Sequence, residues 1–422
     1  MNRRSAIFAI LSATFFMSYF YRTTPAVIAP YLSQEFSLGA ARLGLLSSIF
    51  FYVFAAFQIP LGPLLDKLGP RLVIATLAAV GAAGSLLFAI APSFNLSLLG
   101  RGLMGLGMSC MYMGPLAVIA IWYPSRSFAS MAGLLTALGN TGALIATLPL
   151  AILVEGIGWR PAFLIVAGVT LVLAFLVWLI VRDHPAPDAP PASVGSAEGG
   201  NPAAVTAVEK WPIFSGFRLI FANPSFWAIA GLNFFATGSF SAILGLWGGP
   251  FLMDVFAMSP AGAGKFLSVL SIGYITGNPL VGLLSDRLGA SRKKKTIIGM
   301  ALYLLPLIFL CTVIRGPSTS FLLFPVYFAI GFFAATNILP WAHLKELFPR
   351  RIIGTALTCA NFFAIGGAAV LQFLMGVIIE RYPSVNRVYP PEAYRDAFLL
   401  LLVGMAIAIL LYWKAARETR EP

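Results

Sequence analysis

The sequence predicts an all-α membrane protein in which twelve transmembrane helices form two pseudo-symmetric six-helix bundles. Hydrophobic residues make up 59% of the 422 residues, charged residues make up only 10%, and the mean hydropathy is +0.88. Soluble proteins carry about 25% charged residues, and a chain this apolar would expose large hydrophobic patches to water. Two further observations indicate two bundles: a long sequence repeat, and a polar linker between its two copies.

Twelve apolar stretches are long enough to cross a bilayer, which takes about 20 residues. The first follows Arg3 and Arg4, as in a secretory signal, but it is too long and no small-residue cleavage site follows it. We therefore expect it to remain in the mature protein. The stretches cover approximately residues 6–30, 43–64, 72–92, 97–121, 128–154, 161–181, 224–250, 264–284, 296–314, 320–342, 354–379 and 397–413.

A short motif follows an apolar stretch in each half of the chain. The first copy is GPLLDKLGPR, from Gly62 to Arg71, and the second is GLLSDRLGASRKKK, starting at Gly282. At this offset of 220 residues Asp66 aligns with Asp286. The same offset also pairs Pro30 with Pro250, Leu32 with Leu252 and Phe36 with Phe256. A fixed period of this length indicates two homologous halves rather than a solenoid.

A change in composition marks the boundary between the halves. From about residue 183 to 212 the chain is rich in Pro, Ala, Gly and Ser and has almost no large apolar residues, so it cannot bury a core. We predict an N-terminal bundle at residues 1–182, a flexible cytoplasmic linker at 183–218 and a C-terminal bundle at 219–422. A second conspicuous loop, from Glu380 to Asp396, lies on the predicted outer side, and the sequence leaves its role open.

The net charge of +13 is compatible with nucleic-acid binding, but the positions of the basic residues indicate membrane topology instead. With the N-terminus inside, nineteen of the 28 Lys and Arg residues fall in cytoplasmic segments and eight on the outer side. This asymmetry follows the positive-inside rule and puts both termini in the cytoplasm. We expect a monomer in the bacterial inner membrane, in contact with lipid and not with nucleic acid.

The repeated motif resembles the signature of the major facilitator superfamily in the loop between helices 2 and 3 and its copy between helices 8 and 9. RGLMGLG, starting at Arg101, is similar to the fourth-helix signature, and Trp159, Arg160 and Phe163 resemble the WR..F element of the loop between helices 5 and 6. The resemblance implies a secondary transporter that works by alternating access, without a cofactor.

The resemblance also implies a set of gating residues. Asp66 with Arg71, and Asp286 with Arg287, would latch the cytoplasmic helix ends in the outward-open state and release them in the inward-open state. Arg101 completes the predicted gating set.

The stretch SYFYRTTPAVIAPYLSQEFSL resembles the start of the anion:cation symporter branch, whose members carry organic anions, often with protons. Many members contact the substrate through an arginine in helix 1, and Arg22 falls at that position. Two departures concern proton coupling. Tyr21 stands where many members have an aspartate, and Met108 stands where many have a glutamate.

Arg22 is the residue that bears most on the substrate. It lies in the outer-central part of the first apolar stretch, with Tyr19 on the same helical face, and its repeat-related position is Ala242. An arginine in hydrocarbon costs ~3 kcal/mol on insertion scales, so Arg22 must face a wet cavity or a partner. One interpretation is a structural arginine bonded to helix-end carbonyls. The other, which we favour, is an anion-binding group in a central cavity.

Neutral polar residues within the bilayer are expected to complete the site. Tyr52, Asn337 and Asn361 are the preferred substrate contacts. Each is also able to form an interhelical hydrogen bond instead. The remaining candidates are Gln58, Asn140, Asn233, Tyr274, Asn278 and Gln372.

Carboxylates are scarce in the predicted spans. None of the fifteen Asp and Glu residues sits in the middle of one. Glu155, the nearest, lies at the outer end of the fifth stretch and is interpreted as a cap at the loop. With Arg22 unopposed, the substrate itself would supply the counter-charge, so uniport or anion exchange is favoured over proton symport. The sequence leaves the substrate and the coupled ion open.

The leading prediction is import of a small organic anion, and the alternative is export of a drug or metabolite. The fifth predicted helix, LGNTGALIATLPLA, lacks the glycine-proline signature typical of drug/proton antiporters. No enzyme is predicted, because the spans contain no cluster of His, Cys and carboxylates, and no metal site is expected. His184 and His343 are expected to be solvated, and Cys110, Cys311 and Cys359 to be packing residues.

Overall fold

The computed structural model describes residues 3–183, 218–287, 291–312, 317–349 and 352–416. These parts of the chain are almost entirely helical, and their one extended feature is an isolated bridge between Val385 and Val388. The predicted linker, apart from its end residues 183 and 218, lies outside them.

The first half contains six membrane passes. They are α1 (Arg3–Thr23) with α2 (Pro25–Glu35), α3 (Ala40–Leu68), α4 (Pro70–Ile90), α5 (Phe94–Met108) with α6 (Met113–Trp122), α7 (Ser125–Ile145) with α8 (Leu148–Ile157), and α9 (Trp159–Ile180).

The second half repeats this plan. Its passes are α11 (Pro224–Ala242) with the π-helical turn η2 (Ile243–Trp247) and α12 (Gly248–Phe256), α13 (Pro260–Arg287), α14 (Arg292–Thr312), α15 (Leu323–Ala334) with α16 (Ile338–Leu347), α17 (Ile353–Ile379) and α18 (Pro391–Ala415). Two 3₁₀ segments, η3 (Pro317–Leu322) and η4 (Ala335–Asn337), belong to the pass of α15 and α16.

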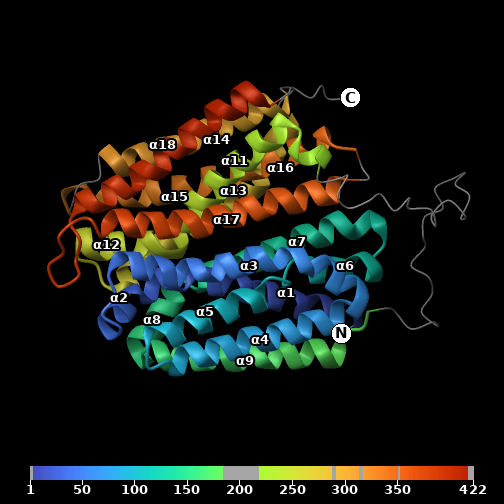
Figure 1. Ribbon diagram of the computed structural model, residues 1–422, viewed down its shortest axis with the longest axis horizontal. Coiled ribbons are helices and arrows are strands. Elements are labelled where there is room, and N and C mark those ends of the chain that lie inside the picture. Colours follow the sequence, from blue (N-terminus) through green and yellow to red (C-terminus); the bar gives the residue numbers. More distant parts are fainter. Residues whose placement is uncertain (1–2, 184–217, 288–290, 313–316, 350–351, 417–422) are drawn as a thin grey trace, which may run out of the picture.

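The prediction of an all-α, twelve-helix membrane fold is confirmed. Within the described residues, nine helical runs are long and apolar enough to cross a membrane, and the pair α7 and α8, bent by 40°, makes a tenth. The two remaining predicted spans are also helical, as α1 with α2 and as α13. Figure 1 shows α1 to α9 (blue to green) and α11 to α18 (yellow-green to red) as two layers of helices lying side by side.

The second membrane pass ends later than the sequence predicted. The first copy of the repeated motif does not follow a helix, because α3 continues through it to Leu68. Gly69, with φ of 78°, ends that helix in a backbone conformation that residues other than glycine rarely adopt. Pro70 then starts α4 at a position where its missing amide hydrogen costs nothing.

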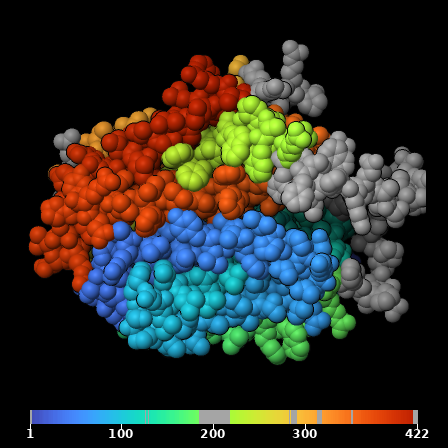
Figure 2. All heavy atoms as spheres, in the orientation of Figure 1, coloured from blue at the N-terminus to red at the C-terminus, as the bar shows by residue number. Residues whose placement is uncertain are grey.

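The two halves meet most closely where α3 lies along α17, as Figure 2 shows in blue and orange. Gly44 of α3 approaches the backbone of Gln372 and Phe373, and a methyl group at Gly44 would lie 2.9 Å from the Gln372 carbonyl oxygen. Gly376 of α17 similarly faces the carbonyl of Ala40. Small residues let helices in a bilayer pack backbone to backbone, so these glycines define the closest seam between the halves.

Proline and polar residues interrupt the first span beside Arg22. Pro25 has no amide hydrogen, so the carbonyl of Tyr21, four residues earlier, loses its helical partner. The hydroxyl of Thr24 donates to that carbonyl at 3.2 Å. The helix axis can therefore break here without leaving a bare carbonyl in the membrane.

Hydrogen bonds join the two halves at the end that carries the connections at residues 36–39, 91–93 and 380–390, which we call the outer end (left in Figure 1). The hydroxyl of Tyr389 accepts from the backbone amide of Ala40 at 3.1 Å. Thr147 and Ser268 share a hydrogen bond of 2.7 Å between their hydroxyls. The guanidinium of Arg387 donates to the carbonyl of Ser33. The outer end is therefore closed in this conformation.

Candidate functional site

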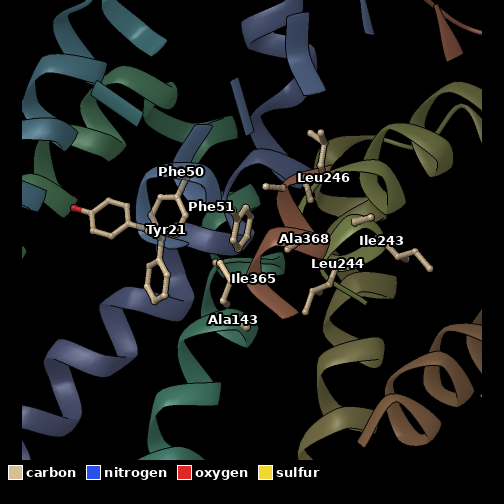
Figure 3. Packing of buried hydrophobic residues seen from close by; sticks show 14 of the residues in the cluster. Tyr21, Phe50, Phe51, Ala143, Ile243, Leu244, Leu246, Ile365 and Ala368 are labelled. Carbon is tan, nitrogen blue, oxygen red and sulfur yellow. The ribbon is translucent and has the colours of Figure 1, made fainter. Parts of the chain in front are cut away.

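A cavity of about 80 Å³ lies between the two halves, at the level of the break in the first span. Helices from both halves build its wall, which contains apolar, aromatic and polar side chains. The lining residues are Tyr19, Arg22, Thr23, Phe51, Ala236, Thr237, Phe240, Ser241, Leu244, Gly245, Tyr274, Ala334, Asn337 and Ile365. Figure 3 shows part of the apolar wall, with Phe51 of α3, Ile365 of α17 and Leu244 of η2 around the same space.

Arg22 supplies the positive charge of the cavity. Its guanidinium carbon lies 4.6 Å from the centre of the Phe54 ring and 5.0 Å from the centre of the Tyr19 ring. These are cation–π distances, and each such contact contributes about 0.5–2 kcal/mol. Aromatic faces therefore hold the side chain in place and leave its hydrogen-bond donors free.

Those donors have no protein partner among the described residues. Arg22 forms no side-chain hydrogen bond and no ion pair there, and its Nε atom is buried. No carboxylate from the described chain lines the cavity. A buried donor without an acceptor carries a desolvation cost of about 1–3 kcal/mol, and more when it is charged. The cavity thus holds an unsatisfied cation.

Asn337 and Thr237 line the same cavity as Arg22 and come from the second half of the chain. The Asn337 amide nitrogen donates to the Thr237 hydroxyl at 2.8 Å, while the Asn337 amide oxygen is buried without a partner. Tyr274 stacks on Phe240, with ring centroids 4.5 Å apart. The cavity can therefore offer a bound molecule one cation, one free amide atom and aromatic faces.

The π-helical turn η2 forms part of the cavity wall. Leu244 and Gly245 of this turn line the cavity, and Gly245 also lies next to the backbone carbonyl of Arg22. Gln372 donates from its amide nitrogen to the carbonyl of Ser241 at 2.8 Å, just before the turn. A π-turn frequently marks a functional site within a helix because it displaces the local backbone.

Of the five predicted substrate contacts, the structure brings Arg22, Tyr19 and Asn337 together at the cavity. Tyr52 and Asn361 are not among the lining residues. Tyr52 is 38% exposed, and the helix turns its neighbour Phe51 toward the cavity instead. Asn361 lies one turn before Ile365, which does line the cavity.

Thr237 was missed by sequence reasoning, and Tyr274 ranked below the preferred contacts. Helical spacing offered one signal, since Thr237, Ser241 and Leu244 recur at four and three residues along one face.

Arg101 lies outside the cavity and is 1% exposed. Its Nη1 atom donates to the carbonyl of Tyr21 at 3.0 Å, and its Nε atom lies 3.5 Å from the carbonyl of Leu46. The Tyr21 carbonyl is the one that Pro25 leaves without a helical partner. Arg101 is thus the arginine that binds helix carbonyls, a role the sequence had left open for Arg22.

The remaining predicted gating residues lie at the opposite end from the outer closure. Asp66 is exposed and forms no ion pair with Arg71 in this conformation. Arg71 donates from Nε to the Trp178 carbonyl at 2.9 Å, and its backbone amide donates to the Asp183 carboxylate at 2.8 Å. The side chains of Asp286 and Arg287 lie outside the described residues.

His343 was wrongly expected to be solvated. It is fully buried, and its Nδ1 atom lies 2.5 Å from the hydroxyl of Tyr412 in α18. The other histidine, His184, lies outside the described residues. Within the described chain no three His, Cys, Asp or Glu side chains are grouped closely enough to hold a metal ion.

Comparison with known proteins covers nearly the whole chain. The family description "Major Facilitator Superfamily" matches residues 11–251 and 229–422. A solved bacterial homologue of the human lysosomal transporter Spinster, in an inward-facing and unoccupied conformation, superposes with a TM-score of 0.78 at 20% identity, over 99% of this chain and 97% of the other.

Three curated relatives align along most of their length. A probable sulfoacetate transporter of Cupriavidus necator is 24% identical over 92% of this chain and 90% of its own. An MFS-type efflux pump of Mycolicibacterium smegmatis is 27% identical over 100% and 94%. A D-galactonate transporter of Escherichia coli is 23% identical over 97% and 96%.

If Arg101 acts by holding the broken first helix to its neighbours, Arg101→Lys should destabilise the fold. A single ammonium keeps the charge but cannot reproduce a planar fork that reaches two carbonyls. We expect the free energy of unfolding to fall by about 1–3 kcal/mol, seen as a lower Tm in detergent. The exposed Arg42, changed to Lys, is the matched control and should alter stability by at most ~0.5 kcal/mol. An unchanged Tm with lost transport would instead identify Arg101 as a gating residue.

Proposed function

Because the chain belongs to the Major Facilitator Superfamily, we propose that it is a secondary transporter that moves a small organic anion across the membrane by alternating access. The observation that carries this proposal is the Arg22 guanidinium, which lines the cavity between the halves without a hydrogen bond or a carboxylate partner in the described chain. A carboxylate or a similar anion would satisfy its donors and neutralise its charge.

The size and polarity of the cavity support a small ligand. Its volume is about 80 Å³ in this conformation, which favours a small ligand. Its polar groups come from both halves of the chain, so orientation would depend on Arg22 from the first half and on Asn337 with Thr237 from the second. Ligand sites of this type combine an apolar wall with a small number of fixed polar contacts.

Two of the relatives are named for organic anions, sulfoacetate and D-galactonate. Their names agree with the charge of the cavity, and both compounds are suitable first ligands for binding experiments. At 23–24% identity they support the class of substrate and not its identity.

Export of a drug or metabolite is the second candidate function. The specific observation in its favour is the 27% identity to an efflux pump over the whole chain. An unpaired cation in the cavity disfavours it for cationic or neutral drugs, because a ligand without negative charge would leave the Arg22 donors unsatisfied. Anionic compounds remain compatible with either direction of transport.

The proposal includes topology and gating. We place the chain in a bacterial inner membrane as a monomer, with both termini in the cytoplasm, since the basic residues cluster at that side. In the outward-open state Asp66 and Arg71 would form the inner latch that the resemblance implies, with Asp286 and Arg287 as its repeat. The exposed, unbonded Asp66 carboxylate of the present conformation suits a latch that is released.

Coupling to protons is not part of the proposal. Tyr21, at the position where many relatives of the branch have an aspartate, shares a 2.9 Å hydrogen bond with Thr170, away from the cavity. Met108 is buried against Gly81. Without a carboxylate beside Arg22 among the described lining residues, the anion itself would be the counter-charge in both directions of travel, as in uniport or exchange.

Transport in proteoliposomes should therefore depend only weakly on an imposed pH gradient. The measurement is uptake of radiolabelled anion with and without an inward proton gradient, with counterflow from preloaded vesicles as the positive control. Accumulation that is driven by the gradient and abolished by a protonophore would contradict uniport or exchange. Glu155→Gln would then be the first variant to examine.

The anion site is tested with two substitutions of Arg22. Arg22→Ala should abolish binding of sulfoacetate or D-galactonate while the protein still folds, because insertion favours loss of a buried charge. Arg22→Lys should bind more weakly than the parent, since an ammonium cannot form the planar, two-pronged contact. Loss of one side of such a pair costs about 2–5 kcal/mol, or roughly 30-fold to several thousand-fold in Kd.

Measuring Kd and Tm together separates binding from stability in these variants. Arg42→Ala removes an exposed arginine from the same half and should leave both quantities unchanged. A structural role for Arg22 would lower Tm in both variants and leave Kd intact. A stable Arg22→Ala protein that binds and transports its anion normally would rule out the proposed site.

A further inference from the structure

Two glutamates at the outer end each cap a helix that belongs to the other half of the chain. The Glu380 carboxylate, at the end of α17, accepts a hydrogen bond of 3.0 Å from the backbone amide of Ala41 in α3. The Glu155 carboxylate, in α8, accepts one of 2.9 Å from the backbone amide of Ala261 in α13. The first contact runs from the second half to the first, and the other runs from the first half to the second.

The two contacts are copies of one another in the internal repeat. Ala41 and Ala261 are related by the 220-residue offset that aligns the two motifs. Glu155 and Glu380 are 225 residues apart, the same offset that pairs Pro115 with Pro340 later in each half. Each half therefore supplies both a helix start that is capped and a carboxylate that caps.

The local geometry is that of a helix N-terminus with a carboxylate placed on it. Ala41 and Ala261 are the second residues of α3 and α13, so their amides have no acceptor within their own helix. The helix dipole adds about half a positive charge at this end, which stabilises a carboxylate there. Ser259, at the start of α13, accepts a 3.1 Å hydrogen bond from the Gly262 amide and leaves the Ala261 amide to Glu155.

Gly39, at the start of α3, is the position that the 220-residue offset pairs with Ser259 at the start of α13. A side chain there would run into the Glu380 carboxylate, because the position of a Cβ atom at residue 39 overlaps the Glu380 oxygen Oε1. The φ of Gly39, −79°, is ordinary for any residue. Glycine is therefore required here by the carboxylate and not by the backbone.

We propose that Glu155 and Glu380 form a symmetric pair of latches that hold the outer end closed, and that both must release when the halves rock to open it. Because donor and acceptor lie in different halves in each contact, separation of the halves at this end breaks both bonds at once. Both glutamates are already exposed in this conformation, so on opening each carboxylate stays in water, its charge is not stranded, and the latch can open and close reversibly.

The two latches act on different helix pairs, which makes their effects separable. Glu380 joins α17 to α3, and Glu155 joins α8 to α13. A helix cap contributes enough to change an equilibrium by roughly 2- to 30-fold. Each latch should therefore bias the conformational equilibrium by a factor in this range, and the two factors should multiply.

The test measures the opening of the outer end by double electron–electron resonance on the full chain in nanodiscs. Spin labels at Asn95→Cys and Ser320→Cys report on exposed positions of the two halves, away from both latches, in a Cys359→Ser background. Glu155→Gln and Glu380→Gln should each increase the outward-open fraction, and the double variant should increase it by the product of the two factors. Glu392→Gln removes an exposed carboxylate from the first turn of α18 that forms no hydrogen bond to α3 or α13 in the described chain, and it should change nothing.

A second variant tests the geometry without removing charge. Gly39→Ala should displace the Glu380 carboxylate and mimic Glu380→Gln, with no further effect when the two are combined. A cap that merely stabilised its helix would lower Tm and leave the distance distribution unchanged, which would overturn the proposal. A double Glu variant with the parent distribution, or a Gly39→Ala effect that adds fully to Glu380→Gln, would overturn it as well.

Discussion

A guanidinium without a counter-charge is the constraint on which the centre of this molecule depends. Hydrocarbon does not tolerate an arginine alone, and the described chain supplies no carboxylate beside Arg22. The faces of Tyr19 and Phe54 hold the charge by cation–π attraction, which orients the guanidinium without using its hydrogen bonds. The fold thus keeps a cation available in a cavity between the two halves, and that availability is the reason we propose the cavity as a site for anions.

The surrounding architecture keeps the two arginines of this region in different roles. Pro25 breaks the first helix just after Arg22 and exposes the Tyr21 carbonyl, and Arg101 from α5 binds that carbonyl. Arg101 therefore donates to backbone carbonyls of its own half, those of Tyr21 and Leu46. Arg22 is the residue after Tyr21, and its side chain has no hydrogen-bond partner in the described chain and lines the cavity between the halves. The break at Pro25 thus places a carbonyl for Arg101 next to the residue that carries the cavity's charge.

Part of the candidate site could be predicted from the sequence, because its residues are polar and stand in otherwise apolar helices. Arg22 and Asn337 stand out as polar residues in apolar helices, and both line the cavity. The rotation of α3, which selects Phe51 over Tyr52, depends on packing against α5 and α17 and leaves no local trace. Contacts between segments that are far apart in the sequence could not be predicted for the same reason. Glu155 could be predicted to be a cap, but the backbone amide that it binds, that of Ala261, lies 106 residues away in the sequence. The burial of His343 depends on its contact with Tyr412 in another helix.

We propose that Arg22 binds an anionic substrate, and a structure of the protein with a transported organic anion bound tests this proposal most directly. We expect the anionic group of the ligand to lie within hydrogen-bond distance of the Arg22 guanidinium, beside the Tyr19 ring, with the rest of the ligand toward Asn337 and Thr237. A ligand bound elsewhere, with Arg22 donating to backbone carbonyls or to a protein carboxylate, would contradict it.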